Sequence, residues 1–165
     1  MSVSDEFESP RKKRHTPAQA LPKIYRFCAY QERSHQEVRQ KLFDLGLYAS
    51  EVDELLSRVI TEGFLNEERF AKAFAGGKFR MKRWGRLKIT HELEAKGLTK
   101  NCIKAGLKEI NDEDYQKALE EVLEKQSVRV ADEPDNFIRR DKIARLAIQR
   151  GFEPDLVWKM VKARY

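Results

Sequence analysis

Three glycines, Gly46, Gly97 and Gly151, occupy the same position in an apolar pattern that recurs along the chain. In every copy, the residues eight and four positions before the glycine and one, six and ten positions after it are apolar. They are Val38, Leu42, Leu47, Val52 and Leu56; Ile89, Leu93, Leu98, Ile103 and Leu107; and Ile143, Ala147, Phe152, Val157 and Val161. Glycine commonly ends a helix by adopting a left-handed conformation. Each copy therefore predicts a helix, a glycine turn and a second helix.

A further helical pattern precedes each copy, near residues 22–32, 67–83 and 114–126, so the chain predicts three tandem three-helix repeats. We expect a disordered basic tail over residues 1–16 and repeats over 17–64, 65–111 and 112–165. Because a unit of about 50 residues buries little surface alone, neighbouring repeats should pack end to end. The expected body is elongated, and a small rotation per repeat would curve it. The alternative is that amphipathic helices resemble one another in general, so that the recurring pattern does not indicate a structural repeat.

Helix punctuation supports an all-α fold class. Ser34 begins a capping-box pattern, and Pro134 and Pro154 each fit the first turn of a helix. Pro22 either starts or kinks the first long helix. Strand signals are almost absent, apart from an isolated patch over 127–130.

Positive charge is concentrated in one stretch of a chain whose formal net charge is only +6. Residues 69–91 contain eight basic residues and no acidic one. The candidates for contact with an anionic partner are Lys72, Lys78, Arg80, Lys82, Arg83, Arg86 and Lys88. We interpret this stretch as a surface that faces phosphates or acidic side chains. A solvated helix face is the plainer alternative.

Several uncharged residues are interleaved with these cations. Phe70 and Phe74 are expected in the core, and Trp84 is expected to pack there rather than to stack on a base. The role of Phe79 stays open between packing and stacking. The pair at 76–77, two glycines within a helical pattern, indicates close helix approach, with a hinge as the alternative.

A second basic set comprises Arg139, Arg140, Lys142, Arg145 and Arg150, on or near a helix of the third repeat. Binding and simple solvation are equally good interpretations of this set. The tail adds a run of basic residues over 11–14, which either contributes non-specific contacts or only increases solubility.

The sequence offers no catalytic signature and predicts no cofactor or metal. There is no Gly-rich loop followed by Lys-Ser/Thr, and His91-Glu92 is not followed by a second histidine at the spacing of zinc proteases. Cys28 and Cys102 lie in apolar contexts and suggest buried thiols rather than a disulfide framework. With no signal peptide or membrane-spanning run, we expect a soluble, non-enzymatic protein of the cytoplasm.

The segment EGFLNEERFAKAF (62–74), followed by WGRLKITHELEAKGL (84–98), resembles the signature region of the RecX family of bacterial recombination regulators. The first repeat, SHQEVRQKLFDLGL, is similar to that family's opening pattern. The resemblance covers about residues 20–165 and is weakest after 110. Residues of the motif are Gly63, Phe64, Leu65, Asn66, Arg69, Phe70, Ala71, Gly85, Lys96 and Gly97.

The resemblance implies a three-helix-repeat protein that binds RecA and the RecA–single-stranded DNA filament and limits recombinase and co-protease activity. It also implies a part in recombinational repair and the SOS response. The main alternative is a direct DNA-binding protein that uses its basic helix-turn-helix-like repeats, and weak direct DNA binding is compatible with both. We expect a monomer, because the repeats can pack on one another without a partner.

Overall fold

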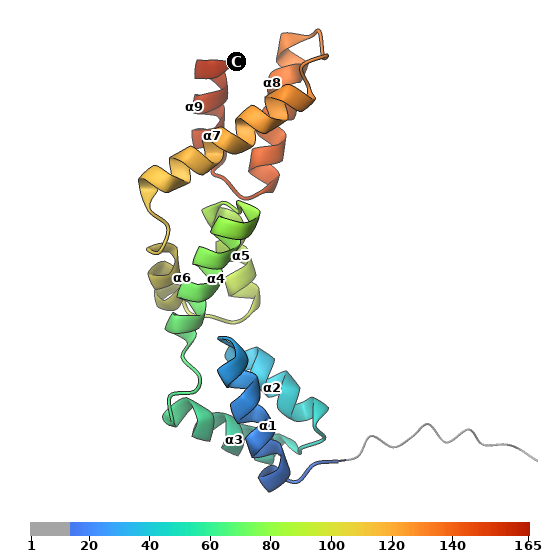
Figure 1. The fold of residues 1–165 in the computed structure, drawn as a ribbon, viewed down its shortest axis with the longest axis vertical. Coiled ribbons are helices and arrows are strands. Elements are labelled where there is room, and N and C mark those ends of the chain that lie inside the picture. The colour runs from blue at the N-terminus through green and yellow to red at the C-terminus, as the bar shows by residue number, and fades with distance from the viewer. Residues whose placement is uncertain (1–13) are drawn as a thin grey trace, which may run out of the picture. The chain divides into compact units, whose positions relative to one another are not determined.

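The computed structural model describes residues 14–165, and the described part of the chain is all-α (Figure 1). Most of the tail predicted over 1–16 lies outside the described residues. No strand forms within 14–165, and the patch 127–130 belongs to the end of a helix. The helices are α1 (Pro17–Tyr30), α2 (His35–Asp44), α3 (Ala49–Thr61), α4 (Glu67–Lys82), α5 (Arg86–Ala95), α6 (Lys100–Leu107), α7 (Asp112–Arg129), α8 (Asn136–Gln149) and α9 (Pro154–Arg164).

The chain divides into two compact units, Met1–Asn66 and Glu67–Tyr165. The first contains α1–α3, and the second contains α4–α9. The helices follow the predicted order of three successive groups of three. The assignment of each group to its own domain stays a prediction, because α4–α9 share one core.

The three repeat glycines end α2, α5 and α8 as the pattern predicts. Gly46, Gly97 and Gly151 have positive φ angles of 86°, 80° and 95°. A side chain would be strained in this region of backbone space, so glycine is the residue that allows the turn. Of the fifteen apolar positions around these glycines, all are buried except Leu107, which is partly buried.

The first unit begins with an ordered helix cap. Thr16 and Gln19 form a capping box at α1, and Pro17 takes the first helical turn. The Arg14 side chain donates hydrogen bonds to the Gly46 carbonyl oxygen (2.9 Å) and to Glu51 (2.7 Å). The expectation of disorder up to residue 16 is therefore wrong for 14–16, since side-chain contacts and a cap hold these residues in place. Pro22 does not start the helix but lies inside it.

The second unit has its closest helix contact between α4 and α6. A Cβ atom on Gly106 would lie 2.7 Å from the carbonyl oxygen of Ala71. The predicted close approach at the 76–77 glycines is wrong: a Cβ on Gly76 would meet only the flexible end of Arg80, and one on Gly77 would meet nothing within 4 Å.

Met81, in the last turn of α4, is 86% exposed. One further expectation fails in this unit. Pro134 precedes the cap of α8 rather than entering its first turn, since the Asp135 side chain accepts a hydrogen bond from the Ile138 N–H. Pro154 does occupy the first turn of α9.

Candidate functional site

The turn between α4 and α5 folds Trp84 back against α4. Arg83 has a positive φ of 53°, and Gly85 caps α5. The Arg83 N–H donates to the Phe79 carbonyl oxygen (3.1 Å), and the Trp84 N–H donates to that of Lys78 (3.4 Å). A turn of this kind commonly closes a helix with glycine, whereas here an arginine occupies the left-handed position.

Three lysine ammonium groups surround the Trp84 ring as a result. The Nζ atoms of Lys78, Lys82 and Lys88 lie 5.1, 5.6 and 4.5 Å from the ring centroid. The indole is partly buried, and it forms a T-shaped pair with the Phe74 ring at a centroid distance of 6.3 Å. We call these three lysines and Trp84 the Trp84 lysine cluster. Cations within about 6 Å of an aromatic face are attracted to its π electrons, so the indole helps to hold three like charges together.

The predicted cationic stretch separates into paired and unpaired residues. Lys72 pairs with Glu68 (3.2 Å), Arg83 with Glu121 (3.1 Å) and Arg86 with Asp112 (2.5 Å). No carboxylate within residues 14–165 lies in ion-pair range of the three cluster lysines or of Arg80. Concentrated positive charge without a counter-charge raises the local potential, so an anion is the ligand that these groups favour.

Arg86 lies within a partly buried network that the sequence did not indicate. Its guanidinium lies 4.0 Å from the Tyr115 ring centroid, and its backbone N–H donates to the Tyr115 hydroxyl (3.1 Å). That hydroxyl donates to a Glu153 carboxylate oxygen at 2.5 Å. Burial, and then the hydrogen bond to Glu153, raise the pKa of Tyr115 well above its ordinary value. These contacts join α5, α7 and the start of α9, so the contacts of Arg86 are structural.

Four of the five residues of the second basic set are engaged within their own unit. Arg139 donates to the Glu133 carbonyl oxygen (2.8 Å) and to Asn136, and Lys142 pairs with the Glu133 carboxylate (2.9 Å). Arg140 donates to the Tyr165 main-chain oxygen (2.6 Å), and Arg145 pairs with Asp141 (2.7 Å). The structure therefore gives these four residues intramolecular partners.

The residues of the motif lie mainly at turns and in the two cores. Leu65, Phe70, Ala71 and Gly85 are buried, and Gly63 and Gly97 have positive φ angles. Phe64 packs on Tyr25 at 4.6 Å between ring centroids, and Lys96 caps α5 with its ammonium 6.0 Å from the Phe70 ring. Asn66 immediately precedes α4, and Arg69 lies in its first turn. Phe79 is also buried, which resolves its role as packing.

The described residues contain neither a candidate metal site nor a helix that could span a membrane. Between residues 14 and 165, no three His, Cys, Asp or Glu side chains gather to hold a metal ion. Over the same range, no helix has the length and apolar character needed to cross a bilayer. Cys28 and Cys102 are free thiols: Cys28 is buried, which raises its pKa, and Cys102 is partly buried.

Comparison with known proteins identifies relatives of one kind. Residues 66–107 match the family model described as RecX, second three-helix domain. Regulatory protein RecX of Salmonella typhimurium (strain LT2) is 24% identical over 156 residues, covering 88% of this chain and 92% of that protein. Its counterpart in Listeria monocytogenes (strain HCC23) is 27% identical over 139 residues, covering 84% of this chain and 48% of the longer relative.

Solved structures share the fold. A crystal structure of regulatory protein RecX has a TM-score of 0.78 at 19% identity, covering 90% of this chain and 74% of the other. RecX from Lactobacillus salivarius also has a TM-score of 0.78 at 19% identity, with coverages of 89% and 95%. The family model spans the helices that form the Trp84 lysine cluster, and the aligned relatives extend along most of the chain. The chain is therefore similar to RecX proteins along most of its length, and its residues 66–107 match the second three-helix domain of that family.

Proposed function

We propose that this protein is a regulator of RecA. It binds RecA and the RecA–single-stranded DNA filament, inhibits recombinase and co-protease activity, and so modulates recombinational repair and the SOS response. It acts in the cytoplasm, as a monomer, without catalysis of its own. Similarity to RecX proteins, which are named as regulatory proteins, supports the regulatory role.

The observation that carries the proposal is the Trp84 lysine cluster. Lys78, Lys82 and Lys88 lie within 5.6 Å of one ring centroid, and none has a carboxylate partner within residues 14–165. A filament presents DNA phosphates and acidic side chains, both of which complement such a surface. Of the cations in α4 and α5, we propose these three and Arg80 as the filament-facing residues, with Lys72, Arg83 and Arg86 in supporting positions.

Direct DNA binding is the second candidate function. The helix–glycine turn–helix units are compatible with it, and lysines around a partly buried aromatic ring could track a phosphate backbone. The two functions differ in what the protein recognises. A direct binder holds naked DNA strongly, with an affinity that falls steeply with salt. A filament regulator prefers the preformed filament.

Affinities for naked single-stranded DNA and for the preformed filament separate these functions. Both are measured at one salt concentration with the wild type and with Lys78→Gln/Lys82→Gln/Lys88→Gln. We expect the wild type to bind the filament more tightly than naked DNA and the variant to lose most of that preference. Lys100→Gln/Lys104→Gln/Lys108→Gln is the charge-matched control, because these exposed lysines lie on or just after α6. Equal wild-type affinity for both ligands would favour the DNA-binding function instead.

A further inference from the structure

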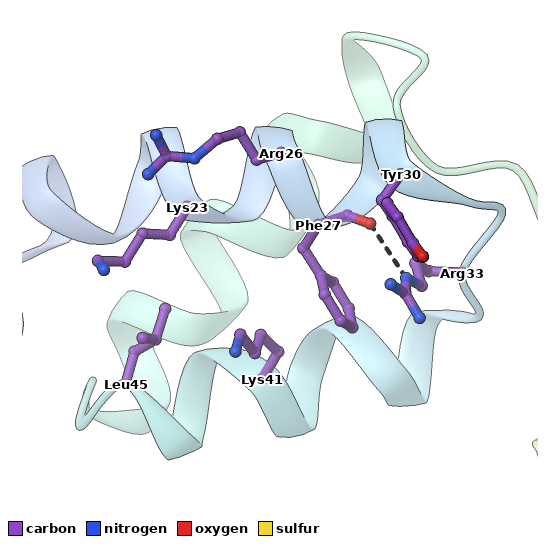
Figure 2. Close-up of a pocket in the computed structure, with 7 residues that line it drawn as sticks. All are labelled: Lys23, Arg26, Phe27, Tyr30, Arg33, Lys41 and Leu45. Carbon is purple, nitrogen blue, oxygen red and sulfur yellow. Dashed lines mark hydrogen bonds between the residues drawn. The ribbon is translucent and has the colours of Figure 1, made fainter.

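A second basic and aromatic surface lies in the first unit, between α1 and α2 (Figure 2). It is an open pocket of about 360 Å³. Lys23, Arg26, Phe27 and Tyr30 come from one side of α1, because their spacing of three and four residues places them on one helical face. Lys41 and Leu45 complete the lining from α2, and Arg33 comes from the connection between the helices.

The charges of this pocket are all positive. Lys23, Arg26, Arg33 and Lys41 line it, and no carboxylate does. Lys23, Arg26 and Lys41 have no carboxylate in ion-pair range among the described residues. The surface therefore carries cations that the fold itself does not neutralise.

The lined surface continues beyond this pocket. Lys23 and Arg26 also line an adjoining pocket, to which His15 and Arg14, the latter paired with Glu51 at 2.7 Å, contribute. From Gln19, another lining residue, to Tyr30, α1 runs for about 16 Å at 1.5 Å per residue. The two pockets thus form a groove along α1 rather than a niche for one small anion. We call it the α1 groove.

An aromatic platform stands at one end of the α1 groove. The Arg33 guanidinium lies 3.8 Å from the Phe27 ring centroid, and its Nε donates to the Phe27 carbonyl oxygen at 3.0 Å. The same guanidinium lies 5.9 Å from the ring of Tyr30, which is 83% exposed. Figure 2 shows Tyr30 beside Arg33, with Phe27 between the two helices. The fold holds Arg33 in place but leaves the Tyr30 ring available to a ligand.

We propose that the α1 groove binds single-stranded nucleic acid, with phosphates on Lys23, Arg26 and Lys41 and a base stacked on Tyr30. Unpaired bases stack on aromatic rings, whereas the bases of a duplex are already stacked. An acidic peptide would use the cations but would leave the exposed ring without a base to stack on it. The proposal does not depend on the regulation of RecA, because the site is complete within the first unit.

The test measures binding of a short fluorescent oligothymidylate to the full chain, without RecA, as salt is varied. For Lys23→Gln/Arg26→Gln, loss of two phosphate contacts should reduce the salt slope by about 1.4 log units per log unit of salt. At about 0.15 M salt, the same loss weakens binding roughly tenfold. Tyr30→Ala should weaken binding at least about fivefold with the slope unchanged, and Tyr30→Phe should keep wild-type affinity. Lys104→Gln/Lys108→Gln is the charge-matched control.

A localised readout separates this groove from the Trp84 lysine cluster. An oligonucleotide carrying 5-iodouracil is cross-linked by light, and the modified peptide is identified by mass spectrometry. Cross-linking at Tyr30 is expected. Cross-links confined to the second unit, together with unchanged affinity in the Lys23→Gln/Arg26→Gln variant, would overturn the proposal. The proposal would also be overturned if Lys23→Gln/Arg26→Gln lost equal affinity for single strand and duplex while Tyr30→Ala had no effect on binding. Competition by polyglutamate gives a third outcome against the proposal. If the same concentration of polyglutamate displaces the strand from the wild type and from Tyr30→Ala, the groove is a site for an acidic protein.

Discussion

Gly85 and Gly151 meet so closely that neither has room for a side chain. A Cβ atom built on Gly85 would lie 2.2 Å from the carbonyl carbon of Gly151, and one on Gly151 would lie 2.3 Å from the Cβ of Lys88. The Gly85 N–H donates to the Arg150 carbonyl oxygen (2.7 Å), and the Leu87 N–H donates to that of Gly151 (3.0 Å). The start of α5 and the turn after α8 are therefore joined backbone to backbone within the second unit.

Gly85→Ala should destabilise the protein by about 2–3 kcal/mol, because the added methyl group meets main-chain atoms rather than a flexible side chain. Gly77→Ala is the matched control. It lies inside α4 with nothing within 4 Å of the added carbon, so it should stabilise the protein by about 0.5–1 kcal/mol. Urea unfolding of both variants measures the difference. Equal stabilities would contradict the backbone contact.

Tyr115→Phe should cost about 1–3 kcal/mol at neutral pH, since it leaves the Arg86 N–H and the Glu153 carboxylate without their hydroxyl partner. The measurement is the free energy of unfolding by denaturant. A cost near zero would mean that water or another group replaces the hydroxyl without loss.

Tyr115 should also make stability fall in alkaline solution. Its pKa is raised in the folded protein, so the folded state holds the phenol proton more tightly than the unfolded state does. This contribution is fully present below the ordinary tyrosine pKa of about 10 and is lost as pH rises above it. Wild type should therefore lose stability between about pH 10 and 11 more steeply than Tyr115→Phe. Parallel curves for the two proteins would contradict the raised pKa.

The sequence predicted the glycine turns and the core but not the Trp84 lysine cluster. Gly46, Gly97 and Gly151 act through local backbone geometry, which a spacing pattern reveals directly. The cluster depends instead on the left-handed conformation of Arg83, at a position where no glycine signals it. Contacts from Tyr115 to Glu153 join segments 38 residues apart, and local periodicity carries no information on such a pairing.

The α1 groove could have been read from the sequence. Lys23, Arg26, Phe27 and Tyr30 repeat at helical spacing, so a shared face was predictable from the residues alone. Positive charge is denser over residues 69–91, in the second repeat, than along this face. Spacing could not predict that Lys41 and Leu45 also line the groove, because this requires α2 to pack beside α1.

Removing the cluster lysines should leave folding nearly unchanged. In Lys78→Gln/Lys82→Gln/Lys88→Gln, weak cation–π attraction is lost while repulsion among three like charges is relieved. The free energy of unfolding should stay within about 1 kcal/mol of wild type. A loss well above about 2 kcal/mol would show that these lysines serve folding rather than binding.

The second basic set should contribute less to filament inhibition than the cluster does. Arg139→Gln/Lys142→Gln/Arg145→Gln removes three charges that already have partners within their unit. We expect this variant to inhibit RecA ATP hydrolysis at concentrations within about threefold of wild type. Exposed charges that are already paired within the protein contribute modestly to binding a partner. A loss as large as that of the cluster variant would place the second set at the filament as well.

The most direct test of the account is RecA ATP hydrolysis dependent on single-stranded DNA, titrated with wild type, Lys78→Gln/Lys82→Gln/Lys88→Gln and the control Lys100→Gln/Lys104→Gln/Lys108→Gln. Circular dichroism first establishes that all three proteins are folded. We expect wild type and the control to inhibit hydrolysis at or below stoichiometric amounts, and the cluster variant to need at least about tenfold more protein. Equal inhibition by all three would contradict the role of the Trp84 lysine cluster, and no inhibition by wild type would contradict regulation of RecA itself.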